Sequence, residues 1–250
     1  MEIPRIDTHI HVTAYREDKP SSDVTVAACI ERCVTHGITS AGMIEHLGGW
    51  RHPIGCLHDL MTEFRQLNSS LPVAIGMEVN IQGPDGTLDG TEADREAVGL
   101  DFVLAESSSI PENLQSIEAL VEFEHRCHMV ATQLPWVDVI VHPWTIIQKR
   151  LSRAGIEEEW RFSDIPQSFL VEWADALAAC NTACEINTKN ISFFEEPLYI
   201  DFIDLLVKRR VKIAVGSDAH QLDRIGSAEP IYRFLEEREV PSELIWYPEL

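Results

Sequence analysis

Two histidines near the start of the sequence, His9 and His11, are separated by a single residue in the run Ile-Asp-Thr-His-Ile-His. Successive side chains of a β-strand point to opposite faces, so these two imidazoles would share one face and could bind one divalent metal ion. Imidazole suits zinc and iron, and carboxylates suit manganese. Further polar side chains follow later apolar runs in the same way: Glu45, His46, Glu78, His142, Glu185, Asn187, Asp218 and His220.

Glu78 is the most informative of the carboxylates because it lies inside an apolar run, Ala-Ile-Gly-Met-Glu-Val. Burying a carboxylate without a partner is too costly, so Glu78 must be paired or bound to a cation. A His-x-His pair alone is a weak signal, and His142 alone could be a core or capping histidine. Considered together, these residues favour a metal site over isolated structural histidines.

The elements that must position these residues alternate along the chain. Apolar, β-branched runs predict strands at residues 3–9, 39–45, 73–81, 101–105, 137–141, 183–187 and 212–217. Amphipathic patterns predict helices at residues 24–36, 58–68, 110–132, 166–180, 196–210 and 227–239. Strands separated by helices imply parallel pairing through right-handed crossovers. The pattern predicts seven strand–helix units in one domain over residues 1–250, with the candidate ligands at the carboxyl ends of the strands.

Local signals suggest the boundaries of some elements. Ser22 or Asp23 is predicted to cap the first helix, and Gly37 to end it. Residues 82–89 predict a turn and a short excursion after the third strand. Residues 148–164 are charged and long, and they predict either a lid beside the site or a solvated connector, of which the connector is favoured.

Composition restricts the partners and the compartment. The 250 residues include 20 Lys and Arg against 41 Asp and Glu, a formal net charge of −21, which argues against binding to nucleic acid or to an anionic membrane. The sequence has neither an apolar run long enough for a membrane span nor a signal-peptide pattern at its start. Its six cysteines are scattered without a CxxC motif and are expected to be buried thiols. We therefore expect a cytoplasmic protein.

Taken in order, the motifs resemble those of the polymerase and histidinol phosphatase (PHP) superfamily. They are Asp-Thr-His-Ile-His ending at His11, Met-Ile-Glu-His ending at His46, Gly-Met-Glu-Val-Asn around Glu78, Val-His-Pro around His142, Glu-Ile-Asn from Glu185, and Gly-Ser-Asp-Ala-His ending at His220. The resemblance spans about residues 3–225. It implies a distorted, TIM-like (β/α)7 barrel that binds two or three divalent metal ions, zinc, manganese or iron. It also implies hydrolysis of a small phosphorylated substrate.

The resemblance implies a ligand set for each metal ion. His9, His11, Glu78 and Asp218 would form the first site, Glu78 would bridge to a second site that includes His142, and His46 and His220 would serve a third. Such ions would provide a metal-bound hydroxide and neutralise phosphate oxygens. Asp218 and His220 are the expected catalytic residues, and His220 or a metal-bound water would protonate the leaving group. Asp7 could orient a ligating imidazole.

The sequence departs from the family pattern at two positions. Ser108 occupies the place of a histidine that usually completes the second site, and Glu106 could substitute for it with carboxylate oxygens. After His11, where the family offers another ligand, Glu17 or Asp18 lies at about the right distance. Glu45 also precedes His46 where many relatives have an aspartate.

Phosphate recognition should require a cation besides the metal ions. Lys189, Arg51 and Arg224 follow strand-end motifs and could bind phosphate, and Asn187 is a further candidate for substrate binding. Aromatic residues near the same loops could shape a substrate pocket or belong to the core: Trp50, Trp144, Phe193 and Phe194.

Two alternatives remain open from the sequence. An amidohydrolase-like or TatD-like barrel also begins with His-x-His and ends with a strand-end aspartate. A catalytically eroded metal-binding domain is the second alternative, and it is favoured by Ser108. The favoured function is metal-dependent hydrolysis of a small phosphomonoester or related phosphoester.

Overall fold

The computed structural model describes residues 3–12, 24–47 and 54–248. Seven parallel strands form one sheet in which each strand pairs with the next along the chain. They are β1 (Ile6–His11), β2 (Ser40–His46), β3 (Val73–Asn80), β4 (Phe102–Glu106), β5 (Val139–Ile140), β6 (Ala183–Asn187) and β7 (Ile213–Gly216).

The first strand also meets the segment that follows the last one. The N–H of His11 donates to the carbonyl of Ala219 over 2.9 Å, and Ile10 and Ala219 form a parallel bridge. The sheet therefore curls into a nearly closed barrel. This confirms the predicted α/β, TIM-like fold with seven strands.

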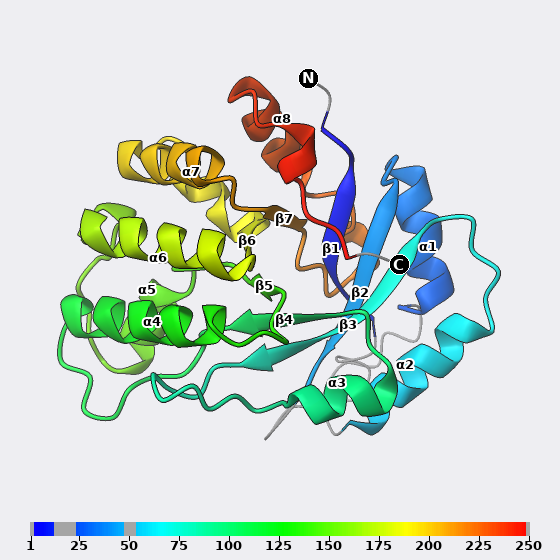
Figure 1. Cartoon of the computed structure of the whole chain (residues 1–250), viewed down its shortest axis with the longest axis horizontal. Helices are drawn as coiled ribbons and strands as arrows, with labels where there is room; N and C mark the ends of the chain where they lie inside the picture. The colour runs from blue at the N-terminus through cyan, green and yellow to red at the C-terminus, as the bar shows by residue number, and fades with distance from the viewer. Residues whose placement is uncertain (1–2, 13–23, 48–53, 249–250) are drawn as a thin grey trace.

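Helices cover the outside of the sheet (Figure 1), with α4, α6 and α7 stacked on one side and α1 and α2 on the other. They are α1 (Val26–Thr35), α2 (Gly55–Arg65), α3 (Glu92–Val98), α4 (Ile117–Thr132), α5 (Ile147–Arg153), α6 (Gln167–Cys180), α7 (Pro197–Arg209) and α8 (Glu229–Glu237). Four short 3-10 helices join them in the described residues: η1 (Phe162–Asp164), η2 (Thr188–Phe193), η3 (Leu222–Arg224) and η4 (Ser242–Leu244). None of the helices in the described ranges is long and apolar enough to cross a membrane.

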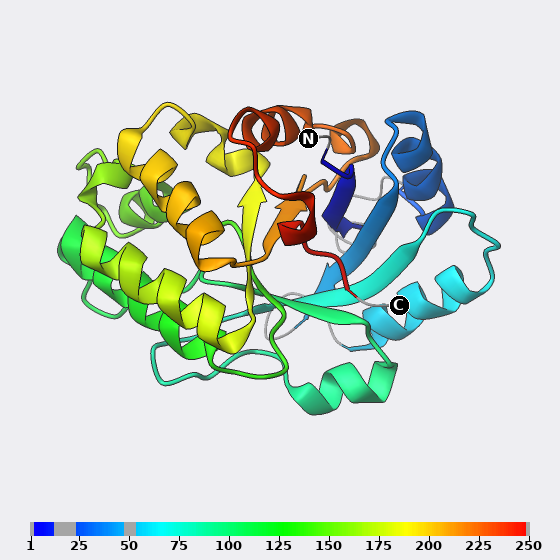
Figure 2. The same cartoon turned by 45° about the horizontal axis from the view of Figure 1, so that its top comes forward.

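The barrel has an inner core distinct from the larger core between sheet and helices. Phe102 lies at its centre, and a side chain at Gly42 or Gly76 would come within 3 Å of the Phe102 ring. Glycine is therefore required at both positions. Trp246 and Tyr247 close the amino-terminal end of the barrel, with the Trp246 and Phe102 ring centroids 5.8 Å apart. Figure 2 shows this C-terminal segment lying across the strands.

Several predicted boundaries are wrong. The N-cap of α1 is Thr25, whose hydroxyl accepts from the N–H of Ala28, while Ser22 and Asp23 lie outside the described residues. The predicted helix at 110–132 begins only at Ile117, and the fifth strand has two residues rather than five. Gly37 does follow the end of α1, with a φ of +70°, and residues 82–89 do form a turn that is closed by a bridge between Ile81 and Leu88.

The segment at residues 148–164 is mostly exposed, as expected of the solvated connector that was favoured, but it also has regular structure and anchors in the core. It contains most of α5 and the turn η1, and it buries several side chains: Arg150, Leu151, Trp160 and Phe162. All six cysteines are free thiols; four are buried, but Cys180 is exposed and Cys56 is half-buried.

Candidate metal centre

The candidate ligands gather at the carboxyl end of the barrel because strand geometry places them there. On β2, Ile44 faces the inner core and His46 lies two residues further along the same face; on β4, Leu104 and Glu106 repeat this arrangement. The register between β2 and β3 places His46 directly opposite Glu78, so the ends of these two strands are level. The earlier inward-facing residues of each strand thus fill the barrel interior, and the last inward-facing residues supply polar side chains.

Glu78 lies at the centre of the cluster and is only 1% exposed. Its Oε2 is 2.9 Å from Nδ1 of His46, 3.5 Å from Nε2 of His11 and 3.6 Å from Nε2 of His9. Its Oε1 is 3.3 Å from Nε2 of His142. One buried carboxylate therefore faces four imidazoles that come from three other parts of the barrel.

Asp218 is the second carboxylate of the cluster. Its Oδ1 is 3.3 Å from Nε2 of His11, 3.5 Å from Nε2 of His220 and 3.6 Å from Nε2 of His9. The structure gives Asp218 a left-handed backbone with a φ of +53°, an unusual conformation for a non-glycine residue that is often found at functional sites. Its Oδ2 accepts a hydrogen bond from Nζ of Lys189.

Three groups of ligand atoms lie close enough to hold a metal ion. Each has its donor atoms within 4.8 Å of one another, and the groups are His9, His11 and Asp218; His46, Glu78 and Glu106; and His11, His46 and His220. Because the groups share members, the ions that they could bind would be neighbours.

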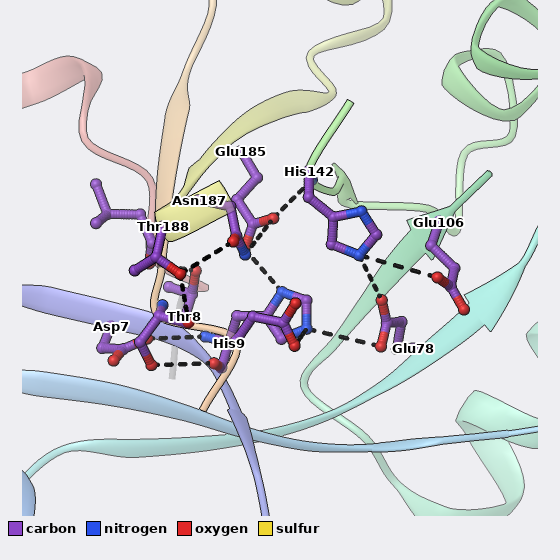
Figure 3. Close-up of polar contacts among 12 residues, drawn as sticks. Asp7, Thr8, His9, Glu78, Glu106, His142, Glu185, Asn187 and Thr188 are labelled. Atoms are coloured by element: carbon purple, nitrogen blue, oxygen red, sulfur yellow. Dashed lines mark hydrogen bonds and ion pairs between the residues drawn. The ribbon is translucent and has the colours of Figure 1, made fainter. Parts of the chain in front are cut away.

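Glu185 holds two of the clustered histidines in place. Its Oε1 lies 2.7 Å from Nδ1 of His9, while its Oε2 accepts from the backbone N–H of His142 over 2.7 Å and from the Asn187 amide over 3.2 Å (Figure 3). A carboxylate can only accept, so Nδ1 of His9 carries the proton and Nε2 faces the cluster. Gly216 makes this contact possible, because a Cβ there would lie 1.9 Å from Glu185 Oε1.

Asp7 does not orient an imidazole, contrary to the prediction. Its Oδ1 accepts from the backbone N–H of Ser217 over 3.0 Å and of His9 over 3.3 Å, and so ties β1 to the end of β7. The carboxylate that holds an imidazole is that of Glu185. Burial raises the pKa of Asp7 to about 6.

The charges of the cluster act on one another strongly. Burial opposes ionisation of Glu78, but His46 and His9 outweigh it and hold the pKa of Glu78 well below its usual value. Burial likewise disfavours the charged form of His9, but Glu185 and Asp218 raise its pKa well above the usual value. Burial and the neighbouring His46 lower the pKa of His11. The neighbouring imidazoles thus favour the ionised form of Glu78, the form that binds cations.

The donor set fits divalent metal ions. Glu78 Oε2 is buried among three imidazole nitrogens, 2.9 Å from Nδ1 of His46, 3.5 Å from Nε2 of His11 and 3.6 Å from Nε2 of His9. Nε2 of His9 and Nε2 of His11 lie 3.1 Å apart, an arrangement in which two nitrogen lone pairs would repel unless a proton or cation lies between them. Imidazoles and carboxylates together suit zinc, iron and manganese.

The two departures from the family pattern have different outcomes. Glu106 is buried and reaches the cluster, with its oxygens 3.9 Å from Nδ1 of His46 and from Nε2 of His142. Ser108 instead donates its hydroxyl to Oδ1 of Asn80 over 2.7 Å. Glu17 and Asp18 lie outside the described residues.

The candidate substrate-binding residues are placed as follows. Lys189 is partly exposed and contacts Asp218, which raises its pKa against the opposing effect of burial. Asn187 is buried, and its side chain contacts Glu185 and accepts from the N–H of Lys189. Arg224 is exposed at the end of η3 and forms no ion pair within the described ranges. Arg51 and Trp50 lie outside those ranges.

The remaining aromatic candidates belong to the core. Trp144 is fully buried with its ring against His128 and Trp173, and the Phe194 ring stacks on Phe234 with centroids 4.0 Å apart. Phe193 is buried against Phe162.

Glu124 and Arg150 were not identified from the sequence. They form a buried ion pair beneath the loops that carry Glu106 and His142. The only signal in the sequence was a charged residue within a helical apolar pattern, which does not reveal its partner.

Comparisons with known proteins establish the fold. No family profile and no curated protein matches the chain. Among solved structures, the histidinol phosphate phosphatase of Lactococcus lactis subsp. lactis Il1403, complexed with zinc, L-histidinol and phosphate, is 17% identical, with a TM-score of 0.62 over 94% of each chain.

Two further matches are weaker. The structures of YwqE from Bacillus subtilis and CpsB from Streptococcus pneumoniae, described as metal-dependent tyrosine phosphatases, match at 18% identity over 98% of this chain and 97% of theirs, with a TM-score of 0.47. A chain of archaeal ribonuclease P matches at 14% identity over 94% and 91%, with a TM-score of 0.42. At these identities, the likeness establishes that the chain has the barrel fold of the Lactococcus phosphatase.

Proposed function

We propose that this protein is a metal-dependent phosphoesterase that hydrolyses a small phosphorylated compound. The observation that carries the proposal is Glu78, a buried carboxylate surrounded by four imidazoles. A carboxylate in this position is suited to bridge two cations. The Lactococcus neighbour, which was solved with zinc and phosphate, supports phosphate as the ligand class.

We assign the ligands by the groups that the side chains form. His9, His11, Glu78 and Asp218 would hold the first ion, and Glu78, Glu106, His46 and His142 the second. His46 and His220, together with His11, are suited to a third. When bound, divalent ions would neutralise phosphate oxygens and lower the pKa of water toward neutrality.

The chain's own residues would bind and orient the phosphate and move protons around it. Lys189 has a side chain that is 42% exposed, so its ammonium can turn from Asp218 to a phosphate oxygen. His220 is 33% exposed, and its ring can face a leaving group while Asp218 lies behind it. Asn187 and Glu185 would keep His9 and His142 in place.

The net charge of −21 restricts this substrate. It would repel polyanions such as nucleic acids, whereas a small phosphate can approach the cationic centre closely, where the local charge dominates. We therefore propose a small phosphomonoester or related soluble phosphoester as the substrate, and the cytoplasm as the compartment.

Metal analysis of the purified protein, paired with hydrolysis of an aryl phosphomonoester with and without added manganese, tests the proposal. We expect two or three ions per chain and turnover that a chelator abolishes. Asp218→Asn should lose metal and activity, whereas Asp204→Asn, which changes a surface carboxylate paired with Arg238, should lose neither. Two ions without phosphatase activity but with amide hydrolysis would favour the amidohydrolase alternative, and fewer than two ions without turnover would favour an eroded site.

A further inference from the structure

A buried ion pair lies outside the metal centre, beneath two of its loops. Glu124 of α4 and Arg150 of α5 are each 1% exposed, and their side chains form a charge-assisted hydrogen bond. Removing two charges from water is expensive, and a buried pair often stabilises a fold no more than apolar residues of the same size would. The groups that the pair contacts suggest another role.

Arg150 holds the backbone that follows β4. Its Nη1 donates to the carbonyl of Ser107 over 3.1 Å, and its Nη2 donates to the carbonyl of Ser109. These two carbonyls flank Ser108 and come directly after Glu106, the last residue of β4. The planar guanidinium therefore fixes the chain at the point where Glu106 turns toward the cluster.

Glu124 holds the backbone that follows β5. Its Oε1 accepts from the N–H of Trp144 over 2.7 Å. Trp144 and His142 both have positive φ angles, +68° and +32°, which are unfavourable for non-glycine residues. The N–H of His142 donates to Glu185, so a buried carboxylate holds this strained turn at each end.

The two restrained side chains meet each other in the metal centre. Nε2 of His142 lies 3.9 Å from Oε2 of Glu106, and both face Glu78. Glu124 and Arg150 make their hydrogen bonds to these two segments with backbone groups. They act on the backbone of two separate loops, and because they are joined to each other, the two loops are held in a fixed relation.

We infer that Glu124 and Arg150 form a positioning pair that sets the spacing of Glu106 and His142 for the second metal ion. This inference rests on the proposed function, because it assigns a purpose to the second site of that centre. It predicts that loss of the pair weakens binding of the second ion even when the fold remains stable.

The experiment must separate positioning from stability. Changing Arg150 or Glu124 alone leaves a buried unpaired charge, which is strongly destabilising and can unfold the chain. The double substitution Glu124→Leu with Arg150→Met removes both charges and keeps similar volumes. We expect it to remain folded, to bind the first ion as the wild type does, and to bind the second about 10- to 100-fold more weakly.

Arg150→Lys provides a conservative comparison. An ammonium can still pair with Glu124, but it cannot reach both the Ser107 and Ser109 carbonyls in the fixed geometry of a guanidinium. We expect an intermediate loss of second-ion affinity in this variant.

Arg95→Met is the matched control. Arg95 donates to the carbonyls of Trp136 and Asp101 and pairs with Asp138, so it makes the same kind of contacts at the opposite ends of the same two strands, β4 and β5. Its loss should lower stability without changing the affinity for either ion.

Titration of the metal-free proteins with Co²⁺, followed by visible absorption, measures the affinity of each site. If the wild type binds two ions, a folded double variant whose second affinity changes by less than about twofold would overturn the inference, although the proposed function would stand. If the wild type binds fewer than two ions, the proposed function fails. The positions of Glu106 and His142 in a crystal structure of the double variant then decide the inference: displacement supports it, and unchanged positions overturn it.

Discussion

Glu185 Oε1 and His9 Nδ1 are 2.7 Å apart at the base of the metal centre, and this contact turns Nε2 of His9 toward the other ligands. The same carboxylate accepts from the backbone of His142 through its second oxygen. One side chain therefore orients two residues that we assign to different metal ions in the proposed centre.

Replacing Glu185 should weaken metal binding without removing a ligand. We expect Glu185→Ala to lower the affinity for the first ion by about 10- to 100-fold, because the His9 ring loses the acceptor that fixes its tautomer. Metal titration measures this loss. Glu172→Gln is the control, since Glu172 contacts His125 at 3.0 Å far from the cluster; equal losses in the two variants would contradict the role given to Glu185.

Gly216 should tolerate no side chain. A Cβ at this position would lie 1.9 Å from Glu185 Oε1 and 2.7 Å from Cβ of His9, so Gly216→Ala must displace one of them. We expect a loss of about 1–3 kcal/mol or more in the free energy of unfolding. Gly55→Ala, where nothing lies within 4 Å of the added Cβ, should change stability by less than about 1 kcal/mol. Chemical denaturation compares the two, and a stable Gly216→Ala protein would show that the barrel can relax here.

If the carboxylate of Glu106 takes the place of the expected histidine, replacing Glu106 and replacing Ser108 should affect metal binding differently. Glu106→Ala should lower the affinity for the second ion by at least about tenfold, or about 1.4 kcal/mol, because it removes an oxygen ligand. Ser108→Ala loses only a hydrogen bond to Asn80 and should bind both ions as the wild type does. If instead Ser108→Ala loses the second ion and Glu106→Ala keeps it, the ligand assignment is wrong.

His128 should make stability depend on pH. It is fully buried against Trp144 and Trp173, and neither ring nitrogen has a hydrogen-bond partner among the described residues, since Glu124 Oε1 lies 3.6 Å from Nε2. Burial lowers its pKa well below 6.5. The folded protein therefore keeps this ring neutral, while the unfolded chain takes up a proton below pH 6.5. Its contribution to stability is complete above that pH and declines as the pH falls, by up to about 1.4 kcal/mol per unit.

The variant His128→Leu isolates this contribution. Denaturation of the metal-free protein at several pH values should show a shallower decline in the variant than in the wild type. The other histidines are present in both proteins and cancel in the difference. Identical slopes would mean that His128 is protonated in the folded state.

The strands and the gathering of their terminal residues could be predicted, because apolar runs and the alternation of side chains are local properties. The short helix α3 was missed because its seven residues are mostly charged and carry no apolar periodicity. Its start is instead defined by a capping box between Thr91 and Asp94, and Gly99 follows its end in a left-handed conformation. The helix α5 was missed because Arg150 resembles a surface residue until its buried partner Glu124 is known.

The supporting contacts of the site depend on tertiary structure and could not be predicted. Asp7 precedes His9 by two residues, so a role at the imidazole was a reasonable interpretation. The carboxylate that holds that ring is 176 positions away in the sequence. It reaches the ring only because Gly216 leaves room on a third strand.

The closure of the barrel by the C-terminal segment has a consequence for synthesis on the ribosome. The N–H of Trp246 donates to Ile213 over 2.8 Å, and the hydroxyl of Tyr247 donates to the carbonyl of Ala41 on the second strand. All seven strands therefore emerge from the ribosome before Trp246 and Tyr247, the residues that close the barrel. A nascent chain that has not yet reached residue 247 would leave the apolar interior around Phe102 uncovered, and transiently exposed apolar surface of this kind favours aggregation.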